Sequence, residues 1–163
     1  MWRLKDLNLE LSDEDIKKRV KLAINLLVVR DSYLLEKNAS ERSISHKLAE
    51  YLQTLFPCWN VDCEYNLNIN ERKILGRISE CSERKTTDRV FPDIIIHKRG
   101  STKNLLVVEM KKNKLNPKCD KKKLELFTDP QEDYKYSLGL FLNFEGIIIG
   151  DKWYKDGRLQ KDS

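Results

Sequence analysis

Two apolar segments separated by a short polar turn restrict the fold of this chain more than any other feature of its sequence. Residues 90–97 and 105–111 are rich in Val, Ile and Leu, and the stretch KRGSTKN between them contains a glycine among polar residues. Branched apolar residues favour strands, and a polar loop of this size with a glycine is typical of a β-hairpin. We therefore expect the two segments to pair as antiparallel strands.

Two amphipathic helices are predicted ahead of this hairpin, within residues 12–56. Ser12 and Asp15 form the pattern of a capping box, and apolar residues then recur at helical spacing. A second helix is expected to begin near Ser40, with an apolar stripe that ends before Pro57.

A strand is predicted between these helices and the hairpin, because apolar and polar residues alternate from Trp59 to Ile69. Glu64 and Tyr65 lie on opposite faces of that strand, and Glu64 is favoured as the residue facing the site described below. The polar stretch 70–89 has few large apolar residues and is expected to be a mobile excursion.

After the hairpin, Asp120 is expected to cap a short helix, followed by strands over residues 134–144 and 147–149. Asp156-Gly157 predicts the turn of a closing hairpin, in which Trp153 and Tyr154 are candidates for a protein interface. The other aromatic residues could stack on unpaired bases, but their period of two favours a core face; they are Tyr134, Tyr136, Phe141 and Phe144.

This order of elements predicts an α/β (α+β) fold with a mixed β-sheet flanked by α-helices. The 163 residues fit one domain, 1–163. Within it we expect an αβββαβ core over about residues 40–150 and a C-terminal hairpin over 147–160.

Composition excludes some classes of protein. No apolar run is long enough to span a bilayer and no signal peptide is evident, so we expect a cytoplasmic protein without a membrane partner. The four cysteines, Cys58, Cys63, Cys81 and Cys119, form no CxxC pair and are expected to be reduced thiols rather than zinc ligands. The patterns GxGxxG and GxxxxGK[ST] are absent, which argues against dinucleotide and P-loop sites.

Three ionisable residues of the hairpin form the candidate site. Asp93 lies near the start of the first apolar strand, and Glu109 and Lys111 share one face of the second. A turn centred near residues 100 and 101 pairs position 93 with position 108 or 109. Carboxylates suit Mg²⁺ or Mn²⁺, and the backbone carbonyl of Met110 could add a ligand. The alternative is an ordinary cross-strand ion pair.

Pro92-Asp93 followed by Glu109-Met110-Lys111 resembles the motif of the PD-(D/E)xK nuclease superfamily, which has the restriction-endonuclease-like fold. The resemblance covers roughly residues 40–145 and implies a divalent-metal-dependent nuclease acting on nucleic acid, with DNA favoured over RNA and RNA left open. It also implies that Glu41, on the preceding helix, is a metal ligand or an orienting residue. For Glu41 the alternative is a carboxylate favoured by the helix dipole.

Basic residues around this motif are the candidates for binding a nucleic acid backbone. The net charge of +5 is too small to indicate a polyanionic partner by itself, but lysines cluster between residues 111 and 123. The candidates are Lys112, Lys114, Lys121, Lys122, Lys123, Arg42 and His46. For each the alternative is a solvated surface residue, and for His46 that alternative is favoured. His97 is expected to lie toward the turn, away from the site.

Two functions remain open at this point. One is a nuclease, and a homodimer or a targeting partner protein would fit it because the chain has little room for a separate DNA-reading domain. The other is a catalytically inactive domain of the same fold that binds nucleic acid or protein and keeps the acidic pair as structure.

Overall fold

The structure is a computed structural model, which describes residues 10–37, 39–64, 91–113 and 118–161. Three helices are found in these ranges: α1 (Asp13–Glu36), α2 (Glu41–Leu55) and α4 (Lys118–Thr128). The strands are β1 (Asn60–Cys63), β2 (Ile94–His97), β3 (Asn104–Lys112), β4 (Leu138–Glu145), β5 (Ile148–Lys155) and β6 (Arg158–Leu159). They form one mixed sheet in the order β1-β2-β3-β4-β5-β6. The predicted α/β class with a mixed sheet is confirmed.

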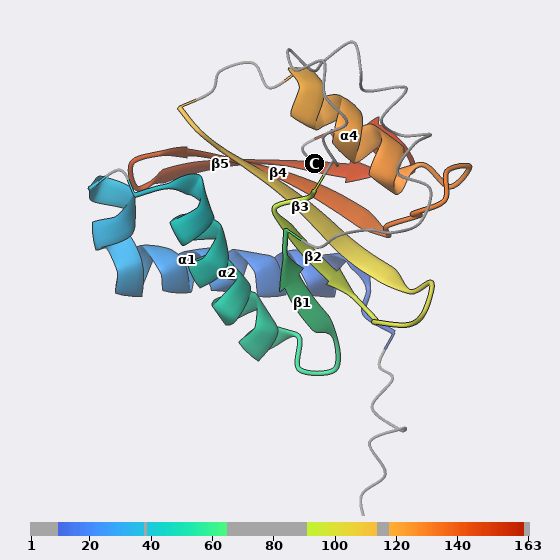
Figure 1. The fold of residues 1–163 in the computed structure, drawn as a ribbon, viewed down its shortest axis with the longest axis horizontal. Coiled ribbons are helices and arrows are strands. Elements are labelled where there is room, and N and C mark those ends of the chain that lie inside the picture. The colour runs from blue at the N-terminus through green and yellow to red at the C-terminus, as the bar shows by residue number, and fades with distance from the viewer. Residues whose placement is uncertain (1–9, 38, 65–90, 114–117, 162–163) are drawn as a thin grey trace, which may run out of the picture.

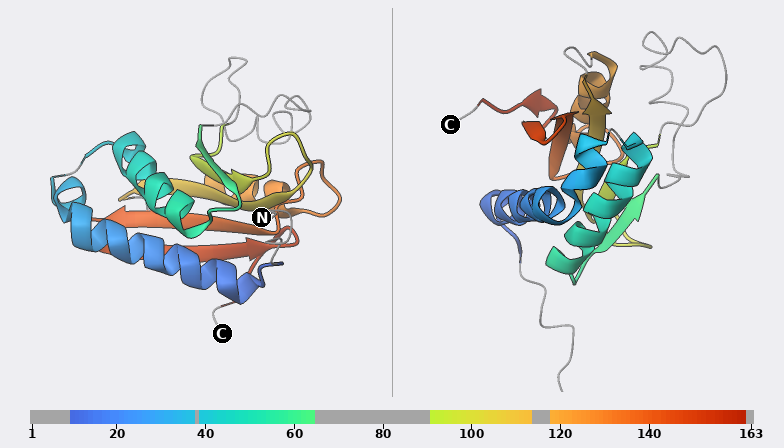
Figure 2. Two further views of the ribbon diagram at one scale, coloured as in Figure 1. Left: turned by 90° about the horizontal axis from the view of Figure 1, so that it is seen from below. Right: turned by 90° about the vertical axis from the view of Figure 1, so that its left-hand side faces the viewer.

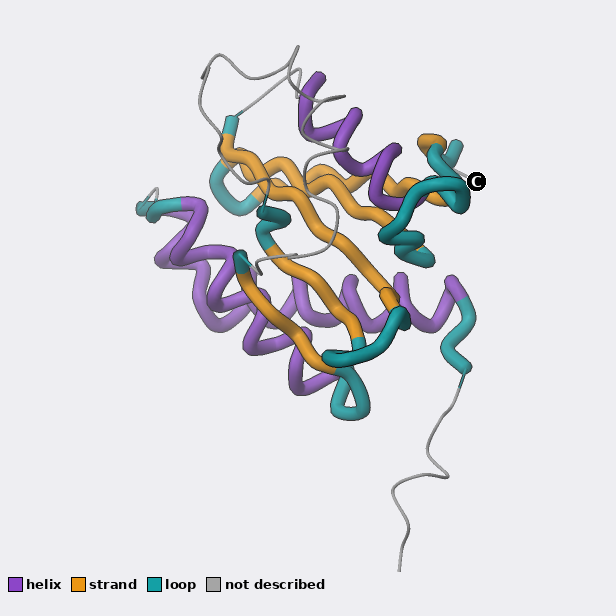
Figure 3. Tube along the Cα trace, turned by 45° about the vertical axis from the view of Figure 1, so that its right-hand side comes forward, coloured by secondary structure: helices purple, strands orange, loops and turns teal. Residues whose placement is uncertain are grey.

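The sheet lies between two helical layers (Figures 1 and 3). Helices α1 and α2 cover one face of the sheet. Their apolar stripes pack against β2, β3 and β4 to form the larger core, which includes Leu27, Leu48 and Val108. Helix α4 covers the other face with a smaller core that contains Val107, Phe127 and Tyr136. Alternate residues of β3 therefore belong to different cores, as strand geometry requires.

Helices α1 and α2 begin where the sequence predicts. Ser12 Oγ accepts a hydrogen bond from the Asp15 backbone N–H at 3.1 Å, and Asp15 Oδ2 accepts one from the Ser12 N–H at 3.2 Å, which confirms the capping box. Ser40 caps α2 through the N–H of Ser43. Helix α1 is kinked at Asp31, whose carboxylate accepts a hydrogen bond from the Tyr51 hydroxyl of α2. No helix in the described ranges is both long and apolar enough to cross a bilayer.

The predicted hairpin is confirmed with its register. β2 and β3 are antiparallel, with Ile94 opposite Val108 and Ile95 opposite Val107. Strand β2 begins at Ile94, later than the predicted start at residue 90, so Asp93 directly precedes the strand. Of the strand predicted over 59–69, β1 covers Asn60–Cys63, Glu64 lies just beyond it, and positions 65–69 fall outside the described residues. The predicted excursion at 70–89 also falls outside them.

The chain crosses from β3 through α4 to β4, which runs parallel to β3 with Lys111 opposite Asn143. The prediction that a strand starts at residue 134 was wrong, because β4 begins at Leu138. Tyr134 and Tyr136 pack instead on the α4 side, with edge-to-face contacts to Phe127 at 5.2 and 6.2 Å between ring centroids. They are core residues, as favoured, but Tyr136 lies in the opposite core to Leu138.

The C-terminal part differs from prediction in its boundaries. One continuous strand, β5, replaces the separate strand predicted at 147–149 and the first arm of the closing hairpin. The predicted turn is present, because Asp156 and Gly157 both have positive φ, 50° and 73°, as a tight hairpin turn requires. Tyr154 is fully buried against α4, so the prediction that it belongs to an exposed interface was wrong. Trp153 is half-buried on the α1 side.

Candidate active site

Three segments distant in sequence meet near the C-terminal end of β3. The hairpin register continues from the pair Ile94–Val108 and brings Asp93 beside Glu109. Helix α2 brings its first residue, Glu41, to Lys111 and Lys112. Helix α4 brings Lys123 to Glu109 from the other side. The expected convergence of Asp93, Glu109, Lys111 and Glu41 is therefore present.

Glu109 is the most unusual member of this group, since its side chain is almost fully buried in a mostly apolar strand. Its Oε2 lies 3.4 Å from Lys123 Nζ, whereas Oε1 is buried with no hydrogen-bond partner among the described residues. Burial raises the pKa of Glu109 to about 8; Lys123 opposes this rise, and Asp93 adds to it. A carboxylate in this state is poorly satisfied by the protein alone.

Asp93 is held in place by the backbone of the neighbouring strand. Its Oδ2 accepts a hydrogen bond from the Met110 N–H at 2.6 Å, and its carbonyl accepts one from the Glu64 N–H at 3.2 Å. Burial raises the pKa of Asp93 above its ordinary range, although the Met110 N–H, Lys111 and Lys123 favour the ionised form. The aspartate is thus fixed beside β3 with one oxygen engaged.

Lys111 and Glu41 form the outer part of the group. Lys111 Nζ lies 3.5 Å from Glu41 Oε2, and Glu41 Oε1 accepts a hydrogen bond from the Lys112 backbone N–H at 3.2 Å. Burial alone would lower the pKa of Lys111, but the surrounding carboxylates, with Asp120 first and Glu41 next, outweigh it and raise the pKa. At neutral pH Lys111 is therefore an ammonium group.

Asp120 is a member of the group that the sequence did not identify. It was predicted as a helix cap, but α4 begins at Lys118, so Asp120 lies in the first turn with its side chain buried. Its Oδ1 is 3.3 Å from Lys123 Nζ, which places Lys123 between Asp120 and Glu109. These two carboxylates outweigh the effect of burial and raise the pKa of Lys123. The sequence feature that could have identified Asp120 is its three-residue spacing from Lys123, because residues i and i+3 of a helix are neighbours on its surface.

The group contains more negative than positive charge. Asp93, Glu109, Asp120 and Glu41 all influence the pKa of Lys111, and Lys123 is the second cation. Four carboxylates and two ammonium groups would leave an excess of two negative charges if all were ionised, but burial opposes that state by raising the pKa of Glu109 to about 8. A divalent cation would favour the ionised form of Glu109 and could bind its unpartnered Oε1.

The residues fit a small set of metal ligands rather than a complete cage. In the described part of the chain no three His, Cys, Asp or Glu side chains are grouped closely enough to hold a metal by themselves. Mg²⁺ commonly binds one or two carboxylates and completes its shell with waters and substrate oxygens. Asp93 and Glu109 suit this mode, and the unpartnered Glu109 oxygen is the observation that favours it.

The predicted nucleic-acid-binding residues are distributed around this group. Lys123 is held by Glu109 and Asp120, and Lys112 Nζ donates to the Ala39 carbonyl. Lys121 and Lys122 are half-exposed on α4, and Lys114 lies outside the described residues.

Arg42 and His46 point into solvent on α2 and pair with carboxylates. Arg42 Nε is 3.0 Å from Glu64 Oε1, and His46 Nε2 is 3.1 Å from Glu50 Oε1. The surface position favoured for His46 is confirmed. Glu64, favoured as a residue facing the site, carries this exposed ion pair, and its backbone N–H donates to the Asp93 carbonyl.

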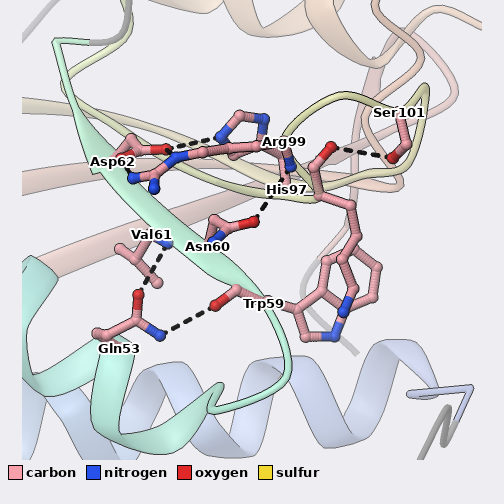
Figure 4. A network of polar contacts seen from close by, with 9 residues as sticks. Gln53, Trp59, Asn60, Val61, Asp62, His97, Arg99 and Ser101 are labelled. Atoms are coloured by element: carbon pink, nitrogen blue, oxygen red, sulfur yellow. Dashed lines mark hydrogen bonds and ion pairs between the residues drawn. The ribbon is translucent and has the colours of Figure 1, made fainter. Parts of the chain in front are cut away.

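His97 belongs to a different polar cluster at the other end of β2 (Figure 4). Its Nε2 lies 2.8 Å from Asp62 Oδ2, and Arg99 also donates to the Asp62 carboxylate. Burial raises the pKa of Asp62, but the bonds from Arg99 and His97 outweigh it and hold the pKa below its usual range. This cluster joins β1 to β2 and its turn, away from Glu109, as expected.

The cysteines that the structure describes form no disulfide with one another. Cys58 is exposed, whereas Cys63 and Cys119 are half-buried; Cys81 lies outside the described residues. Burial raises the pKa of Cys63, which makes it less reactive.

Comparison of the chain with protein-family models, with curated proteins and with solved structures finds no match.

Proposed function

We propose that this protein is a divalent-metal-dependent nuclease that hydrolyses phosphodiester bonds, with DNA as the favoured substrate. The observation that carries the proposal is Glu109, a buried carboxylate with one unpartnered oxygen, placed beside Asp93 and Lys111. A protein gains nothing in stability from such a group unless something else completes it. Metal-assisted phosphodiester hydrolysis uses this set of groups.

The order of elements supports the same proposal. Among the described residues, helix α2, strands β1, β2 and β3, helix α4 and strand β4 come in the order αβββαβ. This order is what the resemblance to the PD-(D/E)xK superfamily implies for its core, and Asp93, Glu109 and Lys111 lie at the motif positions. We therefore infer a restriction-endonuclease-like fold for the part of the sheet that holds the site.

Asp93 and Glu109 would hold the cation, Mg²⁺ or Mn²⁺, together with the Met110 backbone carbonyl. The cation supplies polarisation of the phosphoryl group and stabilisation of the leaving oxygen. The hydrogen bond from the Met110 N–H to Asp93 Oδ2 fixes the aspartate before any ligand arrives. Such preorganisation lowers the cost of assembling the site.

Lys111 is assigned the role of positioning the attacking water. Neighbouring carboxylates raise the pKa of Lys111, so it is an ammonium group that donates hydrogen bonds to the water or to a phosphate oxygen. Glu41 orients this ammonium through its Oε2 and is itself oriented by the Lys112 N–H.

The half-exposed Lys121 and Lys122 on α4 are the candidates for contacts with the substrate backbone. Such contacts do not read base sequence, so targeting by a partner protein or by a second copy fits this assignment. We assign the protein to the cytoplasm.

The test is cleavage of linear and circular DNA, single-stranded and duplex, with Mg²⁺, Mn²⁺ or EDTA. Lys111→Met is compared with Lys103→Met, a matched control because Lys103 is exposed at the opposite end of the same hairpin. We expect cleavage by the wild type and the control, none in EDTA, and a loss of at least about a hundredfold for Lys111→Met. Cleavage that persists in EDTA or in Lys111→Met would refute the assignment.

The alternative is a non-catalytic binding domain, and one observation favours it. Lys123 already supplies a positive charge to Glu109 Oε2, as a structural ion pair would. This alternative predicts salt-sensitive binding of DNA or of a protein. The binding does not depend on metal, and bound DNA is not cleaved. The same assay separates the two, because binding without cleavage under all metal conditions would favour the alternative.

A further inference from the structure

The outer edge of β5 is open along most of its length. The short strand β6 pairs with Tyr154 and Lys155, and Gln160 bonds to Trp153, so residues 148–152 have β4 on one side and no bonded segment on the other within the described chain. An edge of this kind presents peptide groups that can pair with another chain. Its five residues are about as many as an average strand contains.

The peptide groups that face this edge can be identified. The Gln160 N–H donates to the Trp153 carbonyl at 2.8 Å, so the Trp153 peptide groups face outward. Peptide groups of an antiparallel strand alternate between its two sides. Those of Ile149 and Asp151 therefore also face the open edge, whereas those of Gly150 and Lys152 face β4.

A groove accompanies the open edge on the side of α1. It has a volume of about 650 Å³ and lies between the outward-facing residues of β5 and one face of α1. Figure 2 (left) shows α1 running alongside β5. Ile24 and Val28 of α1 form one wall, and Ile149 and Trp153 of β5 form the other. A strand added to β5 would direct every second side chain into this groove.

The charges around the groove indicate the chemistry of its occupant. Lys17, Lys18 and Lys21 line it from α1, and Lys17 Nζ lies 5.5 Å from the centre of the Trp153 ring. The groove also contains two carboxylates, Glu14 and Asp151. Glu14 pairs with Lys18 at 3.7 Å, and Asp151 accepts a hydrogen bond from Trp153 Nε1 at 2.9 Å. The remaining positive charge favours an acidic segment.

We propose that this edge and groove bind an extended segment of a partner protein, which adds a strand to β5. Its alternate side chains are apolar and fill the groove, and its acidic residues meet Lys17 and Lys21. The ladder bonds to Ile149 and Asp151 provide affinity, and the groove provides selectivity, as in other cases of strand addition. The proposal does not depend on the nuclease assignment, because the groove lies on the opposite face of the sheet from Glu109.

A second copy of this chain fits the edge less well. Symmetric pairing about Asp151 would place two carboxylates directly opposite each other, which is destabilising. Symmetric pairing about Gly150 would place Ile149 opposite the carboxylate of its partner. A nucleic acid strand would leave the outward peptide groups without the regular partners that a peptide offers.

The test uses a displayed library of random peptides of about twelve residues, selected on the full chain. Asp151→Pro is the counter-selection protein: the Asp151 N–H faces outward, so proline blocks the edge without removing a bond to β4. Asp151→Ala removes the same side chain but keeps the N–H. Lys17→Glu/Lys21→Glu reverses the charge of the groove, and Lys103→Glu is the control for net charge.

We expect enriched peptides with alternating apolar residues and with Asp or Glu. Their affinity, measured by fluorescence anisotropy, should fall about tenfold or more in Asp151→Pro and in Lys17→Glu/Lys21→Glu, and persist in Asp151→Ala and Lys103→Glu. Peptides that bind Asp151→Pro equally well, or no enrichment over that protein, would overturn the proposal. A concentration-dependent dimer that Asp151→Pro abolishes would overturn it in favour of a second copy. If Asp151→Pro does not fold, the Lys17→Glu/Lys21→Glu comparison decides alone.

Discussion

Lys123 Nζ lies 3.4 Å from Glu109 Oε2, while the other oxygen of that carboxylate is buried without a hydrogen-bond partner in the described structure. The lysine therefore compensates only part of the cost of burying Glu109, and burial still raises the pKa of that carboxyl to about 8. Glu109 therefore influences the stability of the fold, the binding of a cation and the proposed chemistry.

Stability should fall with rising pH because of Glu109. Its pKa is about 8 in the folded chain against 4.5 ordinarily, so between these values the folded state binds a proton that the unfolded state has released. The free energy of unfolding should then decrease from pH 5 to pH 8, by on the order of a few kcal/mol.

Urea unfolding in EDTA at several pH values measures this slope. Glu109→Gln, which cannot titrate, should flatten it, whereas Glu125→Gln, an exposed carboxylate on α4, should leave it unchanged. Equal slopes for wild type and Glu109→Gln would contradict the prediction.

Lys123→Met should destabilise the protein because it removes the cation held between Glu109 and Asp120. Breaking a buried ion pair on one side costs about 3 kcal/mol or more. The loss should be larger at pH 8, where Glu109 ionises, than at pH 5. It should also be smaller when Lys123→Met is made in Glu109→Gln, as measured by a double-mutant cycle of urea unfolding. Additive effects of the two substitutions would mean that the pair does not interact.

Asp93→Ala and Asp93→Asn should differ in stability. Alanine leaves the Met110 N–H without its acceptor, which costs about 1–3 kcal/mol, whereas asparagine retains an acceptor oxygen at the same position. Chemical unfolding of the two variants in EDTA makes the comparison. Equal stabilities would show that the Asp93 bond to Met110 contributes little.

Cation binding should stabilise the wild type and fail in the site variants. Free Mn²⁺ at about one hundred times its Kd should raise the free energy of unfolding by about 2.7 kcal/mol. Asp93→Asn and Glu109→Gln should lose most of this gain, and Lys103→Met should keep it. Thermal unfolding with Mn²⁺ or with EDTA measures the effect. An equal gain in all four proteins would place the cation elsewhere.

Gly139→Ala should weaken the packing of α4 on β4. A Cβ atom at Gly139 would lie 3.0 Å from Thr128 Cγ2 and 3.2 Å from Tyr154 Cβ, closer than such atoms normally approach. Relief of this overlap should cost about 1–3 kcal/mol. Gly150→Ala is the matched control on the neighbouring strand, where a Cβ meets nothing within 4 Å. A neutral Gly139→Ala would mean that α4 moves away at little cost.

Local patterns in the sequence determined the hairpin and the start of α1. The turn between residues 98 and 104 determines which residues of β2 and β3 face each other, so the meeting of Asp93 and Glu109 followed from spacing alone. The Ser12 capping box is equally local, because both of its bonds span three residues. Such features depend on neighbours in sequence and are therefore readable from it.

Tertiary packing decided the features that join distant segments. The approach of Glu41 to Lys111 was suggested only by the family resemblance, since it requires α2 to cross the end of β3. The sequence predicts Asp120 as a cap and not as a buried residue, because its burial depends on where α4 docks. The sequence predicts Tyr154 at an interface, because periodicity cannot distinguish an exposed aromatic from one covered by a helix. Burial arises from elements that meet in space, and a sequence pattern records only the spacing along the chain.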